Sequence, residues 1–315
     1  MEYRKLGNTG ITVSRIGFGV LTMGKSQLNL ELSEGADVLR YALSKGITFI
    51  DTAQYYETYE YIDEALKGTD YQPVICSKCL EWTYSDMDNA INEALAKLHR
   101  DYIDIFLLHE VRPDEIRTGA WDCLMDAKAD GRIRAAGIST HHVDVLEEYI
   151  EKPGLDVVFP LINFAGMGIR RGSGHGSKED MSRAMEKAHA RGIGVFAMKV
   201  FGGGPLVEHY REAMDYVFSK PYVDSVMMGF GKREEVDKAI AYEDGSLPED
   251  YIPDVSKKRT YIEPGNCEGC GTCVARCPNH AMYLGDDGLA HVNEDLCLTC
   301  GYCAPVCPVR AIILL

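Results

Sequence analysis

Four side chains able to release, accept or stabilise a proton follow apolar runs in the first part of the chain. Asp51, Lys78 and His109 each come after a short β-type run, and Tyr56 lies five residues after Asp51. Taken singly, an acid after a strand often caps a helix, a lysine is usually solvated and a lone histidine is usually structural. If the fold brings them together, they could act as general acids and bases and bind an oxygen that gains negative charge.

Cysteines make the second cluster of reactive residues. Eight of the eleven lie after residue 266, in two copies of the spacing Cys-x-x-Cys-x-x-Cys-x-x-x-Cys-Pro, thirty residues apart. They are Cys267, Cys270, Cys273 and Cys277, then Cys297, Cys300, Cys303 and Cys307. Two triplets, each closed by Cys-Pro, indicate two iron-sulfur clusters, with zinc as the alternative for any Cys-x-x-Cys pair. The other three, Cys76, Cys79 and Cys123, are expected to be buried apolar residues.

Composition narrows the class of protein. The 315 residues are 46% hydrophobic and 26% charged, enough for one large core and a small appendage. A net charge of -15 disfavours nucleic acid and anionic membranes as partners. The sequence shows no apolar run of about eighteen residues and no signal-peptide core after Met1, so we expect a cytoplasmic protein.

Short β-type runs alternate with amphipathic helical stretches from about residue 16 to about residue 242. Eight such units predict a (β/α)8 barrel with its chemistry at the carboxyl ends of the strands, and a doubly wound open sheet is the alternative. Gly17-Phe18-Gly19 lacks the third glycine of a Rossmann fingerprint. The predicted strands are Ile16–Phe18, Thr48–Ile50, Val74–Cys76, Ile103–Leu108, Ala135–Ile138, Val157–Phe159, Gly194–Ala197 and Ser225–Met228.

Capping patterns and prolines mark the remaining boundaries. Ser85-x-x-Asp88 and Ser177-x-x-Asp180 each predict the start of a helix. We expect a barrel domain over 1–242, a proline- and acid-containing linker over 243–259 and a small domain over 260–315, whose first and last segments pair as strands. So small a domain buries little surface, so its stability should depend on its clusters.

The first domain resembles the aldo-keto reductase family over about residues 3–242. The likeness is carried by Asp51-Thr52-Ala53-x-x-Tyr56, Ser77-Lys78 and Leu108-His109, and by Arg4-Lys5-Leu6-Gly7-Asn8-Thr9-Gly10 ahead of Gly17-Phe18-Gly19. The resemblance implies that a hairpin at the start of the chain plugs the lower end of the barrel. It also implies a catalytic set in which Tyr56 is the acid, Lys78 lowers the pKa of Tyr56, Asp51 holds Lys78 and His109 orients the substrate.

The same resemblance implies a bound NADPH or NADH, although four positions depart from the family. A Ser-Asn pair, a Gln and a stacking aromatic residue are common after the fifth, sixth and seventh strands, where this chain has Ser139-Thr140, Phe159 and Met198. An arginine common at the position of Gly231 is absent, and Lys232 or Arg233 could take its place. The implied cofactor contacts are Gly19, Val20, Asp51, Ser139, Asn163, Met198, Lys199, Phe201, Gly229, Gly231 and Lys232.

Residues 260–315 resemble the bacterial two-cluster ferredoxins, in which each 4Fe-4S cluster takes three cysteines from one motif and the fourth from the other. The resemblance implies two ligand sets. One is Cys267, Cys270, Cys273 and Cys307; the other is Cys297, Cys300, Cys303 and Cys277.

Three functions are consistent with this combination of domains. The first is an NAD(P)H-dependent oxidoreductase acting on a small carbonyl or alcohol, whose clusters are structural, sensory or a docking platform. The second is an electron-transfer enzyme in which a ferredoxin or flavoprotein partner feeds the clusters and the barrel works without nicotinamide. In the third, the barrel is only a scaffold for an electron carrier.

Overall fold

Eight parallel strands close into the barrel that the sequence predicts. The computed structural model describes residues 1–25, 27–113, 115, 117–172, 174–204, 206–253, 260–277, 280–297, 301, 303–304, 306–309 and 311–314. Around the barrel the order is β3-β4-β5-β6-β7-β8-β11-β12, and β12 pairs with β3. The strands are β3 (Ile16–Gly19), β4 (Phe49–Asp51), β5 (Val74–Cys79), β6 (Ile103–Leu108), β7 (Ile133–Thr140), β8 (Val157–Pro160), β11 (Gly194–Ala197) and β12 (Ser225–Gly229).

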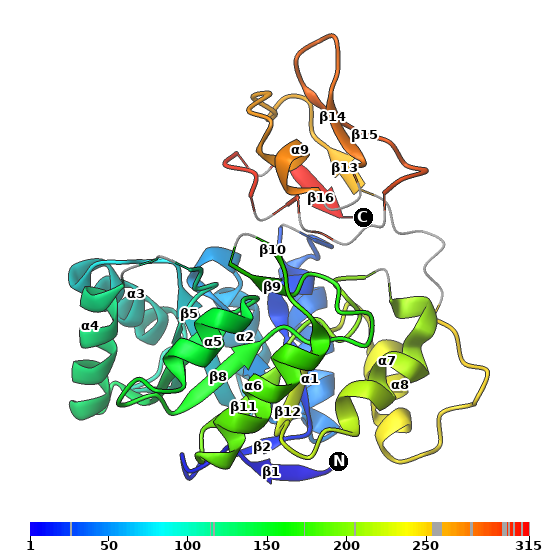
Figure 1. Ribbon diagram of the computed structural model, residues 1–315. Helices are drawn as coiled ribbons and strands as arrows, with labels where there is room; N and C mark the ends of the chain where they lie inside the picture. Colours follow the sequence, from blue (N-terminus) through cyan, green and yellow to red (C-terminus); the bar gives the residue numbers. More distant parts are fainter. Residues whose placement is uncertain are drawn as a thin grey trace.

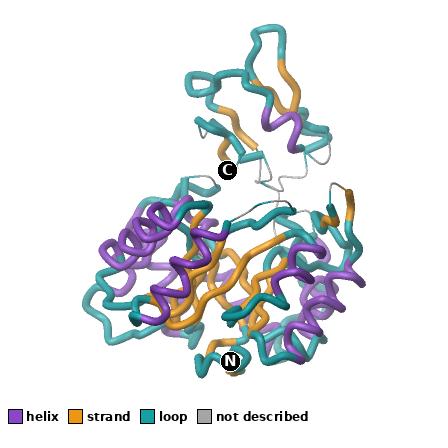
Figure 2. The backbone as a smooth tube through the Cα atoms, turned by 60° about the vertical axis from the view of Figure 1, so that its left-hand side comes forward, coloured by secondary structure: helices purple, strands orange, loops and turns teal. Residues whose placement is uncertain are grey.

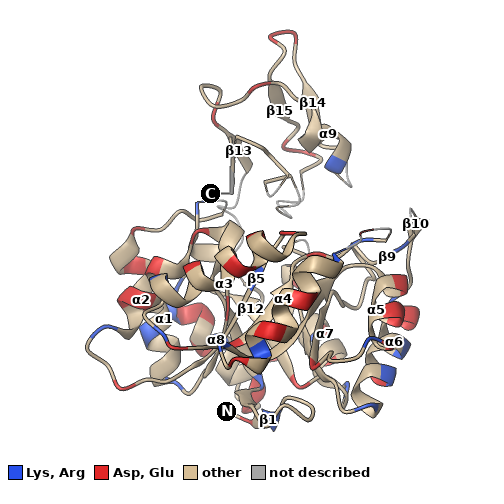
Figure 3. Ribbon diagram, turned by 90° about the vertical axis from the view of Figure 1, so that its left-hand side faces the viewer, with Lys and Arg blue, Asp and Glu red and all other residues tan. Residues whose placement is uncertain are grey.

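Amphipathic helices cover the outside of this barrel (Figures 1 and 2). They are α1 (Leu32–Ser44), α2 (Tyr59–Leu66), α3 (Tyr84–Lys97), α4 (Thr118–Ala129), α5 (Val143–Tyr149), α6 (Lys178–Ala190), α7 (Tyr210–Phe218) and α8 (Arg233–Glu243). Short 3-10 turns, η1 (Val20–Met23), η2 (Gln54–Tyr56) and η3 (Val207–His209), and the hairpin β9 (Arg170–Arg171) with β10 (Gly174–His175) complete this part. Figure 3 shows acidic residues on the outer helices, among them α2 and α4, in keeping with the net charge of -15.

The barrel interior is filled with apolar side chains, so it is a core and not a channel. Phe196 packs edge-on against Phe49 with ring centres 5.1 Å apart, and stacks on Phe159 at 4.3 Å. The hairpin β1 (Tyr3–Lys5) and β2 (Thr12–Ser14) closes the lower end, as expected (Figure 1). Gly7 sits there at φ +51°, and a Cβ on it would lie 2.3 Å from the amide nitrogen of Gly194. Only glycine allows the hairpin to press this closely on β11.

Two local predictions were wrong in detail. The helix predicted to start at Ser85 begins at Tyr84, because Thr83 is the cap and its hydroxyl accepts a hydrogen bond from the Asp86 amide at 3.2 Å. Lys78 was expected after its strand but lies inside β5, in register with Leu107 of β6. The other capping prediction is confirmed, since Ser177 caps α6 by accepting from the Asp180 amide at 3.0 Å.

The C-terminal segment contains two antiparallel strand pairs with the same arrangement. Its elements are β13 (Thr260–Ile262), α9 (Thr272–Arg276), β14 (Met282–Leu284), β15 (Ala290–Val292) and β16 (Ile312–Leu314). β13 pairs antiparallel with β16, and β14 pairs antiparallel with β15. Shifting the register Tyr261↔Ile313 by the thirty residues of the cysteine repeat gives the observed register His291↔Tyr283. The sequence duplication is therefore also a structural one, with the predicted pairing of the first and last segments confirmed.

Candidate active site and cluster-binding segment

A buried ion pair joins two neighbouring barrel strands. Asp51 is the last residue of β4, and the Lys78 ammonium donates to its Oδ1 at 2.6 Å and to the Thr52 carbonyl at 2.7 Å. Lys78 is only 1% exposed. Burial lowers the pKa of Lys78, but the attraction of Asp51 and Tyr56 outweighs it and leaves that pKa above its ordinary value. Burial raises the pKa of Asp51, and the ammonium of Lys78 opposes that rise. Lys78 therefore stays protonated at neutral pH and holds a fixed positive charge at the carboxyl end of the barrel.

Tyr56 and His109 meet beside this pair. Tyr56 ends η2, and Glu57 after it takes a left-handed conformation with φ +54°. The Tyr56 hydroxyl lies 3.5 Å from His109 Nε2, and the Lys78 nitrogen lies 4.8 Å from the centre of the Tyr56 ring. All four predicted catalytic residues thus come together. A carbonyl oxygen placed between the phenol and the imidazole would face both polar groups at once.

The pKa of Tyr56 runs opposite to the expectation from sequence. Burial raises it to about 12, although Lys78 pulls it down, and the carboxylates of Asp51 and Glu110 add to the rise. Lys78 lowers the pKa of Tyr56 as expected, but the loss of water around the buried phenol outweighs that effect. Tyr56 is consequently a protonated phenol across the physiological range.

His109 is neutral in the same range. Burial, with Lys78 and Arg117 next, holds its pKa well below its ordinary value of 6.5. Its carbonyl accepts from Arg117 Nη1 at 2.8 Å and its amide donates to the Cys79 carbonyl at 2.9 Å, so its backbone is fixed on both sides. Its Nδ1 is buried and has no partner among the described residues. The ring is thus held by its backbone and by packing against Tyr56, with ring centres 5.5 Å apart.

These protonation states predict a broad pH profile. We expect kcat/KM for carbonyl reduction to stay flat from about pH 7 to about pH 10, because that parameter reports free-enzyme groups and Tyr56 keeps its proton there. His109 is neutral over the whole window, since its depressed pKa lies below it. The measurement is kcat/KM against pH with the best substrate from a panel of small aldehydes and ketones. A basic limb with its midpoint near pH 8 contradicts a phenol whose pKa is about 12.

Two neighbours of this site were missed by sequence reasoning. His141 follows β7 and is buried, and its Nδ1 lies 3.9 Å from Glu110 Oε1. Burial, with Lys199 and Arg276 next, holds the pKa of His141 well below its ordinary value. Glu110 directly follows His109 and has the left-handed φ of +49°. Their only sequence signal was their place just after the ends of two predicted strands.

The implied nicotinamide contacts divide into two groups. Gly19 lies in register with Gly229 on one side and with Asp51 on the other, so these strand ends form one continuous edge. Val20 follows, fully buried, and Lys232 is exposed at the start of α8. Beyond β11, Lys199 has φ +60° and leads into three left-handed glycines at 202–204. This group fits a ligand that approaches the backbone closely.

The second group is occupied by the protein itself. Asn163 is fully buried; its Oδ1 accepts from the Met167 amide and its Nδ2 donates to the Met167 carbonyl, both at 2.9 Å. The Ser139 hydroxyl accepts from the Glu110 amide at 2.9 Å, and Phe201 stacks on Tyr210 at 5.0 Å. The amide of Asn163 and the ring of Phe201 therefore already have partners in the protein, whereas the Ser139 hydroxyl still has a proton to donate.

The remaining two positions also face the protein. Met198, next to Lys199, packs against the apolar core on both sides of the barrel wall. The Gly231 amide donates to Glu235 Oε2 at 2.7 Å, so a carboxylate already occupies one donor at the start of α8.

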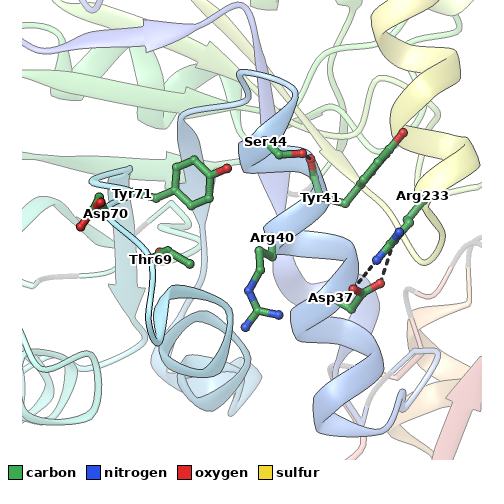
Figure 4. A pocket seen from close by; sticks show the side chains of 8 residues that line it. All are labelled: Asp37, Arg40, Tyr41, Ser44, Thr69, Asp70, Tyr71 and Arg233. Carbon is green, nitrogen blue, oxygen red and sulfur yellow. Dashed lines mark hydrogen bonds and ion pairs between the residues drawn. The ribbon is translucent and has the colours of Figure 1, made fainter.

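An open pocket of about 730 Å3 lies on the outside of the barrel (Figure 4). Its lining residues are Asp37, Arg40, Tyr41, Ser44, Thr69, Asp70, Tyr71 and Arg233. Arg233 forms an ion pair there with Asp37, and both side chains are exposed. No residue of the Asp51, Tyr56, Lys78 and His109 set lines this pocket, so the chemistry is assigned to the strand ends.

The cysteines of the C-terminal segment have surroundings that suit iron-sulfur clusters. Burial raises the pKa of Cys273, and the nearby Cys270 and Cys307 add to the rise, so three of the first predicted ligand set lie together. Cys267 belongs to the same apolar cluster. Gly269, at φ +65°, lets this loop pass close to the β14–β15 turn, because a Cβ would lie 2.1 Å from the Gly288 carbonyl oxygen. Of the second set, Cys277, Cys297 and Cys303 are described, and Cys300 lies outside the described residues.

Backbone amides point at several of these sulfurs. The Ala281 amide donates to Cys277 Sγ and the Ala311 amide to Cys307 Sγ, both at 3.2 Å and thirty residues apart. The Ala290 amide donates to Cys267 Sγ at 3.3 Å. Hydrogen bonds to sulfur stabilise charged thiolate ligands and tune a cluster's potential. In the described part of the chain no three Cys, His, Asp or Glu side chains converge to hold a single ion, which is no obstacle to a cubane whose ligands bind separate irons.

Comparison with known proteins supports both family resemblances. Residues 15–216 match the model of the aldo/keto reductase family, and residues 260–315 match that of the 4Fe-4S dicluster domain. The chain belongs to the aldo-keto reductase family. This aldo-keto reductase thus has the eight-stranded barrel expected from its sequence, joined to a 4Fe-4S dicluster domain.

Relatives of this aldo-keto reductase differ in what they share with it. L-galactose dehydrogenase of Arabidopsis thaliana is 24% identical over 66% of this chain and 68% of its own length. Aldo-keto reductase YhdN of Bacillus subtilis is 30% identical over 52% of this chain, and the match spans only 54% of YhdN. One component of the Na(+)-translocating ferredoxin:NAD(+) oxidoreductase complex of Acetobacterium woodii is 35% identical over 19% of this chain and 20% of its own length.

Solved structures agree on the fold. Aldo-keto reductase AKR11C1 from Bacillus halodurans, in its holo form, superposes with a TM-score of 0.64 and 17% identity over 81% of this chain and 99% of its own. PA4992 from Pseudomonas aeruginosa superposes with a TM-score of 0.67 and 23% identity over 78% of this chain and 96% of its own. At these identities the likeness concerns the fold alone. Among the residues described, no helix combines the length and apolar character that spanning a bilayer requires.

Removal of iron tests the dependence of the small domain on its clusters. We expect chelation in air to unfold β13 to β16, because the few buried side chains of this segment are largely cysteines and their neighbours. Far-ultraviolet circular dichroism should retain the barrel helices, while hydrogen exchange of the four strands becomes complete. Amides of β14 and β15 that stay protected after full iron loss would show that the segment folds without its clusters.

Proposed function

We propose that the protein interconverts a small carbonyl compound and its alcohol, with Tyr56 as the proton donor. The observation that carries the proposal is the convergence of the Tyr56 phenol, the Lys78 ammonium and the neutral His109 at one end of the barrel. His109 orients the carbonyl oxygen and Tyr56 gives it a proton as negative charge builds there. Lys78, held by Asp51, stabilises the phenolate that remains, and in the oxidation direction the phenolate takes the proton back.

The two electrons have two candidate donors. The first is NADPH or NADH, which when bound supplies hydride to the carbonyl carbon. Family membership supports it, together with the strand-end edge at Gly19 and Gly229 and the basic residues Lys199 and Lys232, which we propose as its contacts. Free thiols at Cys76, Cys79 and Cys123 also suit a reducing compartment, and we place the protein in the cytoplasm.

The second donor is the pair of 4Fe-4S clusters, reduced by a ferredoxin or flavoprotein partner. Two one-electron deliveries and two protons then convert the carbonyl to the alcohol. The occupied amide of Asn163 favours this candidate, because Asn163 was expected to contact the nicotinamide carboxamide. We propose the two crossed cysteine sets as the cluster ligands in either case.

Anaerobic titration distinguishes the donors. The full-length holoprotein is mixed with NADPH or with dithionite and then with a panel of small aldehydes and ketones, while absorbance and electron paramagnetic resonance follow the clusters. Carbonyl-dependent oxidation of NADPH with unchanged clusters supports the first donor. Reoxidation of dithionite-reduced clusters by a carbonyl, without NADPH, supports the second. Absence of alcohol formation under both conditions across the panel rejects the proposed function.

A further inference from the structure

One ion pair links the cysteine-rich segment to the catalytic loop. An Arg276 guanidinium nitrogen lies 3.4 Å from Glu110 Oε1, and the two side chains are 22% and 24% exposed. Arg276 ends α9 and directly precedes Cys277, while Glu110 directly follows His109. The contact therefore spans 166 residues of sequence and joins a predicted cluster ligand to a predicted catalytic residue through their immediate neighbours.

The Glu110 backbone is held firmly in place. It adopts φ +49°, a conformation unfavourable for a residue with a side chain, and its amide donates to the buried Ser139 hydroxyl at 2.9 Å. The flanking Val111 amide donates to the Ser139 carbonyl at 2.9 Å. The Glu110 carboxylate also forms an ion pair with Arg112, whose Nη2 lies 3.1 Å from Glu110 Oε1. Glu110 is thus presented as a fixed negative charge and not as a mobile surface side chain.

The arginine of this contact belongs to the first copy of the cysteine repeat and has no counterpart in the second. Thirty residues after Arg276 the chain has Val306, so only the first cysteine motif carries a cation at this point. Figures 1 and 2 show the segment beyond the end of the barrel opposite the β1–β2 hairpin. The two predicted clusters are consequently not equivalent with respect to the barrel, although their strands follow one plan.

We propose that the Arg276–Glu110 ion pair docks the C-terminal segment on the mouth of the barrel, with the cluster completed by Cys277 next to the catalytic loop. The other cluster, which includes Cys267, lies farther from it. Any electron exchange through this contact rests on the second donor of the proposed function, whereas the docking and the order of the clusters do not.

Cluster potentials test this order without substrate or turnover. A negative charge near a cluster makes its reduction harder, so its removal should raise the potential. We expect Glu110→Gln to shift one of the two voltammetric waves of the holoprotein to more positive potential. Glu268→Gln, beside Cys267, should shift the other wave. Glu151→Gln is the matched control, because Glu151 also pairs with arginine on the barrel but lies before β8, at the opposite end.

The voltammetric waves and a hydrogen-exchange measurement together decide the proposal. Separate waves moved by Glu110→Gln and Glu268→Gln, with neither moved by Glu151→Gln, support the proposal. It is overturned if Glu110→Gln behaves like the control or moves the same wave as Glu268→Gln. As a second measurement, Arg276→Glu should increase hydrogen exchange at residues 109–111, and the double variant with Glu110→Arg should restore it; no increase in the single variant also overturns the docking. Absence of carbonyl turnover would reject the proposed function, but it would not change how the voltammetry and the hydrogen exchange are interpreted.

Discussion

Replacing Tyr56 by phenylalanine should lower kcat for carbonyl reduction by about 10²- to 10⁴-fold, the usual contribution of a positioned general acid. The ring, its contact with His109 and its place over Lys78 remain, so only the transferable proton is lost. Burial keeps this phenol protonated. Of the other described groups in the catalytic set, His109 is a neutral imidazole and Lys78 is held by Asp51 and Thr52, so neither is an equivalent donor.

The measurement is steady-state turnover with the donor that the anaerobic titration supports. Tyr55→Phe is the matched control, since it removes the hydroxyl of the neighbouring residue in the same turn. Circular dichroism should be unchanged in both variants. If Tyr56→Phe keeps the turnover of the control, Tyr56 is not the proton donor and the proposed mechanism is wrong.

Lys78→Met should have the largest effect on stability. The substitution keeps most of the side-chain volume but leaves the Asp51 carboxylate buried without its cation, which costs about 3–5 kcal/mol in comparable pairs. Urea unfolding of the barrel, followed by far-ultraviolet circular dichroism, measures the loss. The helices of the barrel dominate that signal because α9 has only five residues.

A double variant gives the control. Adding Asp51→Asn removes the stranded charge, so Lys78→Met with Asp51→Asn should recover part of the free energy of unfolding while carbonyl turnover stays lost. A loss below about 1 kcal/mol in the single variant would be typical of an exposed pair and inconsistent with a 1% exposed lysine.

The eight strands were predictable because their apolar runs are short and separated by amphipathic helical stretches. Asp51 and His109 fall at strand ends as expected, since a run that ends in a polar residue usually ends the strand. Lys78 did not follow this rule. Its strand continues because the buried Asp51 compensates the charge, and that compensation depends on a partner strand, which no local pattern contains.

Three further features could not be predicted for a related reason. They are the pKa of Tyr56, the occupied amide of Asn163 and the role of Glu110. Each depends on what surrounds the side chain in three dimensions: lost water for the phenol, the Met167 backbone for Asn163 and Arg276 for Glu110. The cysteine segment was easier. Its repeat fixes both composition and register, so the pairing of β13 with β16 followed from the sequence.

The Arg276–Glu110 ion pair gives the proposed docking a dependence on salt. Both side chains are partly exposed, and dissolved ions weaken such a pair. Raising the ionic strength should therefore loosen the cysteine-rich segment from the strand ends where the reacting groups lie, and any effect of that segment on turnover should fade as salt is added.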